Sequence, residues 1–436
     1  MAPPVSSFGK SSLRPQLDLQ VSPSLTNSDD EQELAVADLL IAAAEGDVPS
    51  AKKFAKKLVL AGIGVDEAVA AVDDPGSKRR GPLHLAAAAG KAEVCALLVE
   101  EFHADVDAAD VEGATPLIFA VQGMGSTAVV GLLLCYGANA NKADNGGIVP
   151  LHIVAERGSY ALAELLLSNG AEIDPICEKI GSPVHIAAEN GNAGVLKLLL
   201  QHDADCDRFS SLFNTPLAAS AFGSSLECME ILIEAGADVN SGSPETPLMI
   251  AAGKGSIACI KCLLKAGADA NIPDESGKVP VEIAALKGQE ECVEILFPVT
   301  TPLAEYADWS IDGIVRHGKI VRLRQAYKIK AEGDAAFKKK DYLLASSRYT
   351  QALDMDSADS TLYAKRSLCF QQMNDKEKAL ADANTFRQRQ PDLPESSEEE
   401  GTAMKLVECD ACCWSGKGTQ RQSKGSSSGR GAATTQ

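Results

Sequence analysis

Aromatic residues and long apolar runs are scarce in this sequence. Phe, Trp and Tyr make up 5% of the 436 residues, although hydrophobic residues make up 45%. The apolar content therefore comes mainly from small and aliphatic residues, which favours helices rich in Ala and Leu over a β-sandwich. No run of eighteen apolar residues is present, so we expect a soluble protein without a membrane span.

The first residues, MAPPVSSFGKSSLRPQ, also lack the apolar core that a secretory signal needs. Their Ser content and the absence of an acidic residue before Asp18 leave a transit peptide open, but no amphipathic Arg-rich helix is evident. We therefore expect the protein in the cytosol or the nucleus.

Sequence motifs of catalysis are missing. The chain has no G-x-x-x-x-G-K-[ST] phosphate loop, no G-x-S-x-G nucleophile turn and no H-E-x-x-H zinc motif. An enzyme needs a nucleophile, an acid-base pair, a metal or a phosphate-binding loop held in a pocket. We expect no catalytic residues, no cofactor and no metal, and thus a protein that is not an enzyme.

Positive charge is in deficit, since 60 acidic residues face 41 basic ones and the net charge is −19. Like charges repel, so this balance disfavours general binding to nucleic acids or to anionic membranes. Local basic patches remain compatible with it.

Twelve cysteines are scattered through the chain, mostly singly and in apolar segments, which is typical of buried, reduced thiols. Cys259 and Cys262 form a C-x-x-C, but their helical spacing inside an apolar run favours core packing over a redox pair. Cys409, Cys412 and Cys413 form a C-x-x-C-C. Neither a second pair nor a His follows, so zinc is disfavoured there.

What the sequence does contain is a repeat. Segments such as GPLHLAAAAG, VPLHIVAERG and TPLMIAAGKG recur at steps of 31 to 34 residues, with Pro at positions 82, 116, 150, 183, 216, 247 and 280. Most are followed by a Leu-rich run that ends in a Gly-Ala-Asp/Asn-like turn. This pattern resembles the ankyrin repeat, whose TPLHxAA and LLxxGAxxN motifs are matched in all seven copies.

Each part of the pattern has a physical reason. Pro suits the first turn of a helix, where its missing N–H is harmless, and the preceding Thr or Ser can cap free N–H groups. Gly should end the first helix in a left-handed conformation at positions 90, 158, 191, 255 and 288. We expect His84, His152 and His185, which occupy the TPLH position, to bond neighbouring backbone and not a metal.

The ends of the array look different from its repeats. Asp38 to Leu58 has an AAAEG helix and an amphipathic partner but no TPLH start, so we interpret it as a divergent capping repeat. Residues 1–33, rich in Pro, Ser and acidic residues, are expected to be disordered. The ankyrin region is therefore assigned to residues 34–298, and a linker to residues 299–326.

A second period of 34 residues follows. Gly333 aligns with Ser367, Ala345 with Ala379, and Ser357 with Pro391, and D-Y-x-x-A begins at Asp341. This resembles the tetratricopeptide repeat (TPR), which we assign to residues 327–408. The whole chain resembles plant-type ankyrin plus TPR proteins, and we expect an all-α fold in which an ankyrin solenoid precedes a short array of helical hairpins.

The third TPR motif is incomplete. GTAMKLVE, Gly401 to Glu408, fits its first helix, but residues 409–436 carry no pattern for a second helix and are expected to form a disordered tail. We interpret this ending as truncated or altered.

The resemblance also implies a test for chaperone binding. In co-chaperones, three TPR motifs form a clamp of Lys, Asn and Arg that grips the Glu-Glu-Val-Asp tail of heat-shock chaperones. The equivalent positions here are Lys330, Asp334, Lys365, Glu395 and Glu399. Only Lys330 matches, and two of the expected cations are acids, so we expect the clamp to be broken.

Candidate contact residues come from positions that vary between repeats. The tip DRFSSLFN carries Arg208, Phe209, Leu212 and Phe213, and Phe222 lies on the adjoining helix. The alternative is that Phe209 and Phe213 tuck under the neighbouring tip.

Arg157 and Lys254 occupy variable positions on the first helices, in mixed charge that is typical of a solvated face. A basic run is either an import or acidic-partner patch or a solvated helix face: Arg316, Lys319, Arg322, Arg324, Lys328, Lys330, Lys338, Lys339 and Lys340.

These observations predict a monomeric scaffold that binds partner proteins through the concave face and hairpin tips of its ankyrin repeats, with the TPR region as a second platform. The alternative is a co-chaperone that binds the tails of heat-shock chaperones through the TPR region.

Overall fold

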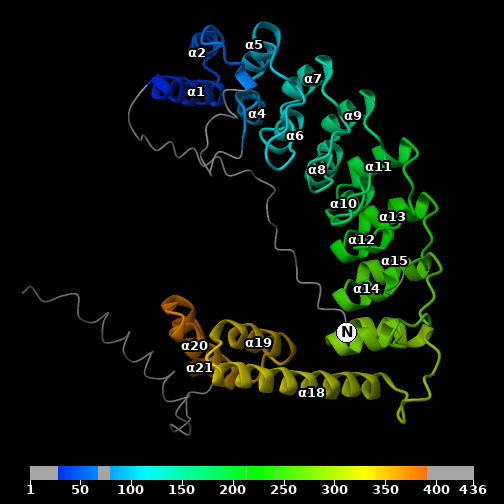
Figure 1. Cartoon of the computed structure of the whole chain (residues 1–436). Helices are drawn as coiled ribbons and strands as arrows, with labels where there is room; N and C mark the ends of the chain where they lie inside the picture. Colours follow the sequence, from blue (N-terminus) through cyan, green and yellow to red (C-terminus); the bar gives the residue numbers. More distant parts are fainter. Residues whose placement is uncertain (1–27, 67–78, 213, 243, 390–436) are drawn as a thin grey trace, which may run out of the picture. The chain divides into compact units, whose positions relative to one another are not determined.

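The computed structural model describes residues 28–66, 79–212, 214–242 and 244–389, and side chains from residue 34 onward. The chain divides into two units, Met1–Ile311 and Asp312–Gln436, which are described separately. The described residues form helices and no strand, apart from isolated bridges at Cys177–Gly181 and Ser210–Asn214. The predicted all-α class is confirmed (Figure 1).

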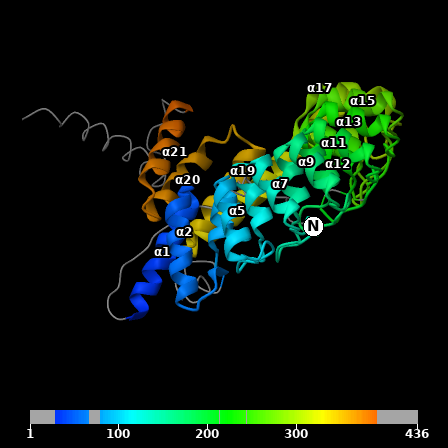
Figure 2. The ribbon, with the colours of Figure 1, turned by 90° about the horizontal axis from the view of Figure 1, so that it is seen from above.

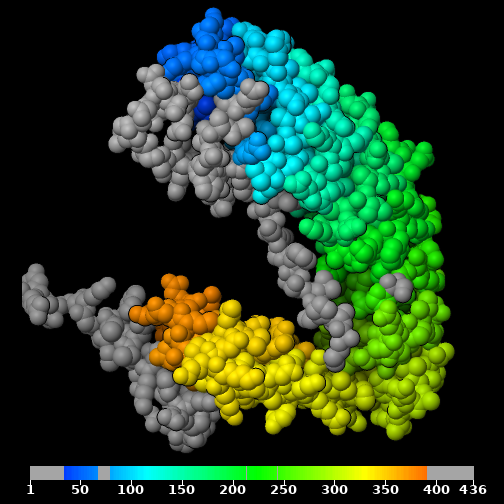
Figure 3. Space-filling model, viewed as in Figure 1, coloured from blue at the N-terminus to red at the C-terminus, as the bar shows by residue number. Residues whose placement is uncertain are grey.

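The first unit is a stack of helix pairs in chain order. The first helix of each repeat packs on the first helix of the next, and the second helices form their own row (Figures 1 and 2). The pairs are α4 (Pro82–Ala88) with α5 (Ala92–Phe102), α6 (Pro116–Gln122) with α7 (Thr127–Cys135), α8 (Pro150–Arg157) with α9 (Tyr160–Ser168), α10 (Pro183–Glu189) with α11 (Ala193–Gln201), α12 (Pro216–Gly223) with α13 (Leu226–Glu234), α14 (Pro247–Lys254) with α15 (Ile257–Lys265), and α16 (Pro280–Lys287) with α17 (Glu290–Leu296). In space-filling view, neighbouring repeats form a continuous surface (Figure 3).

Every first helix begins at the Pro that the sequence period marks. Thr115, Thr215 and Thr246 cap their helices by accepting the N–H of the residue three positions on. The five glycines named above all have positive φ, between 70° and 77°, as predicted.

The TPLH histidines have the structural role expected of them. His152 Nδ1 accepts the N–H of Val149 at 3.1 Å, and its Nε2 lies 3.1 Å from the Pro175 carbonyl in the next tip. His84 and His185 repeat this arrangement. Each ring therefore ties the start of a helix to the following hairpin.

Both ends of the ankyrin stack are covered. At the N-terminal end, α1 (Ser28–Glu45) packs on α2 (Val48–Leu60) and α4, in keeping with a capping pair. Helix α1 begins before the expected boundary at residue 34, and residues 1–27 lie outside the described residues.

At the other end, the region expected to be a linker, residues 299–326, contains contacts with the last repeat and the start of a helix. Helix α17 continues into a 3₁₀ turn, η1 (Phe297–Val299). Trp309 then stacks on Phe297 with ring centroids 5.4 Å apart, and Tyr306 donates to Glu282 at 3.0 Å. These contacts hold residues 300–310 on the last repeat because their aromatic side chains find partners there. From Ile311 onward the chain is already helical.

The second unit consists of α18 (Ile311–Lys338), α19 (Tyr342–Met355), α20 (Ser360–Gln372) and α21 (Lys376–Arg389). The later part of α18 with α19, and α20 with α21, correspond to the two predicted motifs. Gly333 is required where α18 meets α19, since a Cβ there would lie 2.7 Å from the Tyr349 ring. Its counterpart Ser367 is fully buried and donates to the Ala364 carbonyl.

The described cysteines are free thiols, and Cys259 lies buried in α15 beside the half-buried Cys262. This agrees with core packing. Burial raises the pKa of Cys95 and of Cys369 to about 12, so these thiols stay protonated and unreactive at neutral pH. Cys409, Cys412 and Cys413 lie outside the described residues.

Candidate interaction surfaces

One position that varies strongly in the ankyrin unit recurs on the first helix of each repeat. It is the sixth residue after the Pro of each first helix, near the helix end, and it is half-buried in most repeats. We call this series the inner strip: Ala88, Gln122, Glu156, Glu189, Phe222, Gly253 and Leu286. Because these residues lie on neighbouring first helices, they form a row along one side of the stack.

Two carboxylates stand next to each other in the inner strip. Burial raises the pKa of Glu156, against the opposing effect of Arg157. Burial also raises the pKa of Glu189, where Lys254 opposes the shift and the Glu156 carboxylate adds to it. Within the described part of the chain, neither carboxylate is hydrogen-bonded by another group. A pair of half-buried acids without donors favours an incoming cation.

The strip continues into an aromatic residue with a cation above it. The Nζ of Lys254 lies 3.6 Å from the centroid of the Phe222 ring. At this distance the ammonium group is attracted to the face of the ring. The structure thus brings together two of the predicted contact residues, Phe222 and Lys254, beside Glu189.

Arg157 has a different environment. Its Nη1 donates to the carbonyls of Val121 at 2.8 Å and Gly123 at 3.0 Å, and also to that of Gln122. These carbonyls end α6 and lack helical partners of their own. The guanidinium therefore ties one repeat to the previous one, a role that the sequence reading missed.

Glycine at the next position allows close approach between repeats. A Cβ on Gly223 would lie 1.9 Å from the Glu189 carbonyl oxygen, and one on Gly123 would lie 2.1 Å from that of Ala88. Neither glycine was singled out from the sequence. They set how tightly the inner strip is spaced.

The fifth-repeat tip is exposed, as its apolar residues suggested. Phe209 is 59% exposed and Leu212 is 36% exposed, so the alternative in which Phe209 tucks under its neighbour is wrong. Phe213 lies outside the described residues. Ser211 Oγ donates to the Glu178 carbonyl at 3.1 Å, which places the fourth-repeat tip alongside.

That neighbouring tip adds Ile176, which is 44% exposed. The sequence reading missed it, although Ile176 lies seven residues before the Pro of its repeat, as Phe209 does in the next repeat. Burial raises the pKa of Asp174 between these tips, and the Arg208 cation opposes this effect. Arg208 Nε is buried without an acceptor among the described residues. We call Ile176, Phe209 and Leu212 the tip patch.

The described positions of the expected clamp are already paired. Lys330 Nζ donates to Asp359 Oδ2 and to Thr361 Oγ1, both at 2.6 Å. Lys365 Nζ donates to Asp334 Oδ1 at 2.7 Å, and the Tyr349 hydroxyl donates to the same oxygen at 2.8 Å.

Although burial opposes it, the hydrogen bonds from Lys330 and Thr361 hold the pKa of Asp359 below its ordinary value. Asp359 therefore stays ionised and neutralises Lys330 at neutral pH. Glu395 and Glu399 lie outside the described residues.

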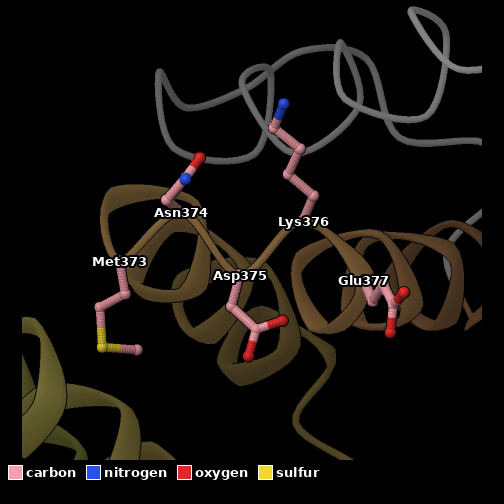
Figure 4. Close-up of a pocket in the computed structure, with 5 residues that line it drawn as sticks. All are labelled: Met373, Asn374, Asp375, Lys376 and Glu377. Atoms are coloured by element: carbon pink, nitrogen blue, oxygen red, sulfur yellow. The ribbon is translucent and has the colours of Figure 1, made fainter. Parts of the chain in front are cut away.

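The described residues of the second unit line at least two hollows. The first is an open depression at the α20–α21 turn, lined by Met373 to Glu377, whose side chains project to both sides of the ribbon (Figure 4). The second, which we call the α18 groove, has a volume of about 180 Å³ and is lined by Leu323, Ala326, Tyr327, Lys330, Asp356, Asp359 and Leu362.

Among the described residues, no group of three His, Cys, Asp or Glu side chains is arranged to hold a metal ion. Within the same residues, no helix combines the length and hydropathy needed to cross a bilayer.

Comparison with known families agrees with both repeat assignments. A model of ankyrin repeats matches three times, at residues 39–144, 151–243 and 217–303. A model described as serine/threonine-protein kinase BSK1-like, TPR repeats, matches residues 319–397. Neither matched family model is a catalytic domain.

Individual proteins match shorter stretches. The heat shock protein sti1 homolog of Schizosaccharomyces pombe is 38% identical over 79 residues, which is 18% of this chain and 13% of that protein. The DnaJ homolog subfamily C member 7 homolog of the same organism is 38% identical over 73 residues, 16% of this chain and 15% of that protein. The crystal structure of the human ASB11 ankyrin repeat domain is 29% identical and covers 52% of this chain and 100% of its own, with a TM-score of 0.47.

Proposed function

The chain belongs to the ankyrin-repeat family and carries a TPR-type domain, and from this premise we propose a non-catalytic scaffold that binds a basic, partly apolar segment of a partner protein along its inner strip. Ankyrin and TPR repeats indicate a protein-interaction scaffold. To this we add the site on the chain where the partner binds and the chemistry of the partner segment.

The observation that carries the proposal is the pair of half-buried carboxylates, Glu156 and Glu189, beside Phe222. A Lys or Arg of the partner would supply the hydrogen-bond donors that these acids lack among the described residues, and its aliphatic stem would lie along the strip. An adjacent apolar side chain of the partner would contact the Phe222 ring. The tip patch extends the apolar surface and suits a second anchor of the partner.

Two of the predicted contact residues act differently in this proposal. Arg157 supports the strip from behind through the α6 carbonyls and does not contact the partner. Lys254 lies over Phe222 and limits the strip to partners whose cation binds at the Glu156 end.

The alternative, a co-chaperone for acidic chaperone tails, is less favoured. The short similarity to the sti1 homolog is compatible with it. However, Lys330 and Lys365 are each paired with an aspartate, so an incoming carboxylate would have to displace an internal one. We also propose a monomer in the cytosol or nucleus that binds neither nucleic acids nor membranes, in keeping with its net charge of −19.

A selection from a random peptide library on the full-length chain tests the proposal. We expect enriched peptides that combine Lys or Arg with a nearby apolar residue. Their affinity should fall at least tenfold when Glu156→Gln, Glu189→Gln and Phe222→Ala are combined.

The matched control is Glu164→Gln with Glu230→Gln, two exposed acids on the second helices α9 and α13. It should leave the affinity unchanged. Enrichment of acidic peptides, or equal losses in both variants, would exclude the inner strip as the binding site.

A further inference from the structure

One side of α18 carries exposed apolar residues. Ile320, Leu323 and Tyr327 are 44%, 39% and 77% exposed. Their spacing of three and four residues places them on one face of the helix. Leu323 and Tyr327 also line the α18 groove. A stripe of this kind, next to a groove, is suited to an amphipathic segment.

The same helix is strongly basic. From Gly313 to Ala331 the sequence has six Lys or Arg and no Asp or Glu. Lys319, Arg324 and Lys328 are exposed and lie on either side of the apolar stripe. The whole chain has a net charge of −19, so the positive charge of this face is opposite in sign to the charge of the chain. It selects for an acidic occupant.

The chain itself leaves α21 beside this groove. Helix α21 ends at Arg389, whose guanidinium donates to the Ser357 carbonyl and lies 5.1 Å from the centroid of the Tyr363 ring. Ser357 belongs to the loop whose residues Asp356 and Asp359 line the α18 groove. Residues after 389 therefore start at the edge of the groove.

The sequence of that segment complements the α18 face. Residues 392–400, DLPESSEEE, contain five acids and no Lys or Arg, and Met404, Leu406 and Val407 follow. Fifteen residues separate Arg389 from Met404, enough to span roughly 50 Å when extended. The exposed stripe from Ile320 to Tyr327 needs only about 10 Å of helix.

We propose that residues 392–408 dock on the α18 face of their own chain. The acidic block lies along Lys319, Arg324 and Lys328, and the apolar residues after it enter the groove at Leu323 and Tyr327. Asp359 on the groove rim does not repel the segment strongly, because Lys330 neutralises it. Docking there is independent of binding at the inner strip.

Carbodiimide cross-linking of the full-length chain tests the proposal, since it joins Lys amines to carboxylates in contact. We expect cross-links from Lys319 and Lys328 to the acids of residues 392–400, detected by mass spectrometry. Lys338, which ends the same helix, and Lys339 and Lys340 in the turn after it provide the background rate.

Two variants keep every reactive group and remove the apolar contact. Met404→Ser, Leu406→Ser and Val407→Ser together, or Leu323→Ser with Tyr327→Ser, should reduce these cross-links at least fivefold. Leu343→Ser with Leu344→Ser is the matched control, because these α19 residues are also exposed, at 73% and 45%. It should change nothing.

Mixing ¹⁴N- and ¹⁵N-labelled chains distinguishes the occupants. Cross-links within one isotope class support docking in the same chain. Mixed-isotope cross-links would overturn the proposal in favour of a second copy. Cross-links at the Lys338–Lys340 background, or unaffected by both apolar variants, would overturn it altogether.

Discussion

Lys365 Nζ lies 2.7 Å from Asp334 Oδ1. In the co-chaperone clamp that the TPR region resembles, the two equivalent positions hold donors for a carboxylate of the bound peptide. Here the two side chains are bonded to each other. Lys330 and Asp359 form a second such pair at 2.6 Å. Both pairs link α18 to the second TPR motif. The two pairs stabilise the second unit and also neutralise the cations Lys330 and Lys365.

This relationship predicts that the full-length chain does not bind a peptide ending in Glu-Glu-Val-Asp. Asp334→Asn with Asp359→Asn should create weak binding, because Asn removes the competing charge but still accepts from Tyr349 and Thr361. Calorimetric titration measures both proteins. Lys330→Ala added to the double variant should abolish the gain, whereas micromolar binding by the unaltered chain would contradict the prediction.

Gly223→Ala should lower the free energy of unfolding by about 2–3 kcal/mol, since overpacking a tight contact typically costs this much. The reason is the 1.9 Å separation that a Cβ would have from the Glu189 carbonyl oxygen. Gly194→Ala is the matched control: no atom lies within 4 Å of its Cβ position, and it is in α11.

Ala is the better helix former, so the control should stabilise the protein by about 0.5 kcal/mol. Urea unfolding of both variants gives the two free energies. Equal effects would mean that the repeats can separate without cost at this glycine.

The repeat fold could be predicted because its signals are local. A Pro at a helix start and a Gly at a helix end act within a few residues, so the bounds of α8 and α14 follow directly from the sequence. Where the pattern changes, the same hydrogen bond still forms. Glu282 stands in α16 where other repeats have a histidine, and it accepts the Val279 N–H at 3.0 Å.

The candidate site was less predictable because its contacts join residues about 30 positions apart. Arg157 looked like a free surface cation until its bonds to the preceding repeat were seen. Lys330 likewise finds Asp359 only through the packing of α18 against the α19–α20 loop. The tip of repeat five was recognised from its composition, but its neighbour Ile176 depends on how two tips align.

Arg157→Met should lower the free energy of unfolding by about 1 kcal/mol, because an exposed charged donor that bonds several carbonyls contributes an amount of this order. Met keeps much of the aliphatic length but removes every donor. Lys254→Met is the comparison, since Lys254 lies over the Phe222 ring and beside Glu189 and bonds no backbone carbonyl among the described residues.

We expect the Lys254 variant to lose less than about 0.5 kcal/mol, as a single exposed cation–π contact would suggest. Urea unfolding again gives both values. If the Lys254 variant lost as much stability as the Arg157 variant, Arg157 would have no special role between repeats.

Acid should destabilise the ankyrin unit through its buried histidines. Burial lowers the pKa of His185 to about 4, from its ordinary 6.5, and also lowers the pKa of His84 and His152. The folded state therefore favours the neutral ring. The contribution of the neutral ring to the free energy of unfolding is complete above pH 6.5. It is lost as the pH falls from 6.5 towards 4, because the unfolded chain binds the proton more readily than the folded chain.

For His185 alone, the loss between pH 7 and pH 5 should be about 2 kcal/mol. His185→Gln tests this, because a Gln oxygen can accept the Ser182 N–H as Glu282 does for Val279, yet it does not titrate. The variant should lose about 2 kcal/mol less than the unaltered chain between the two pH values. His202→Gln, at an exposed position after α11, should keep the full acid dependence. Parallel curves for His185→Gln and the unaltered chain would mean that other groups cause the acid sensitivity.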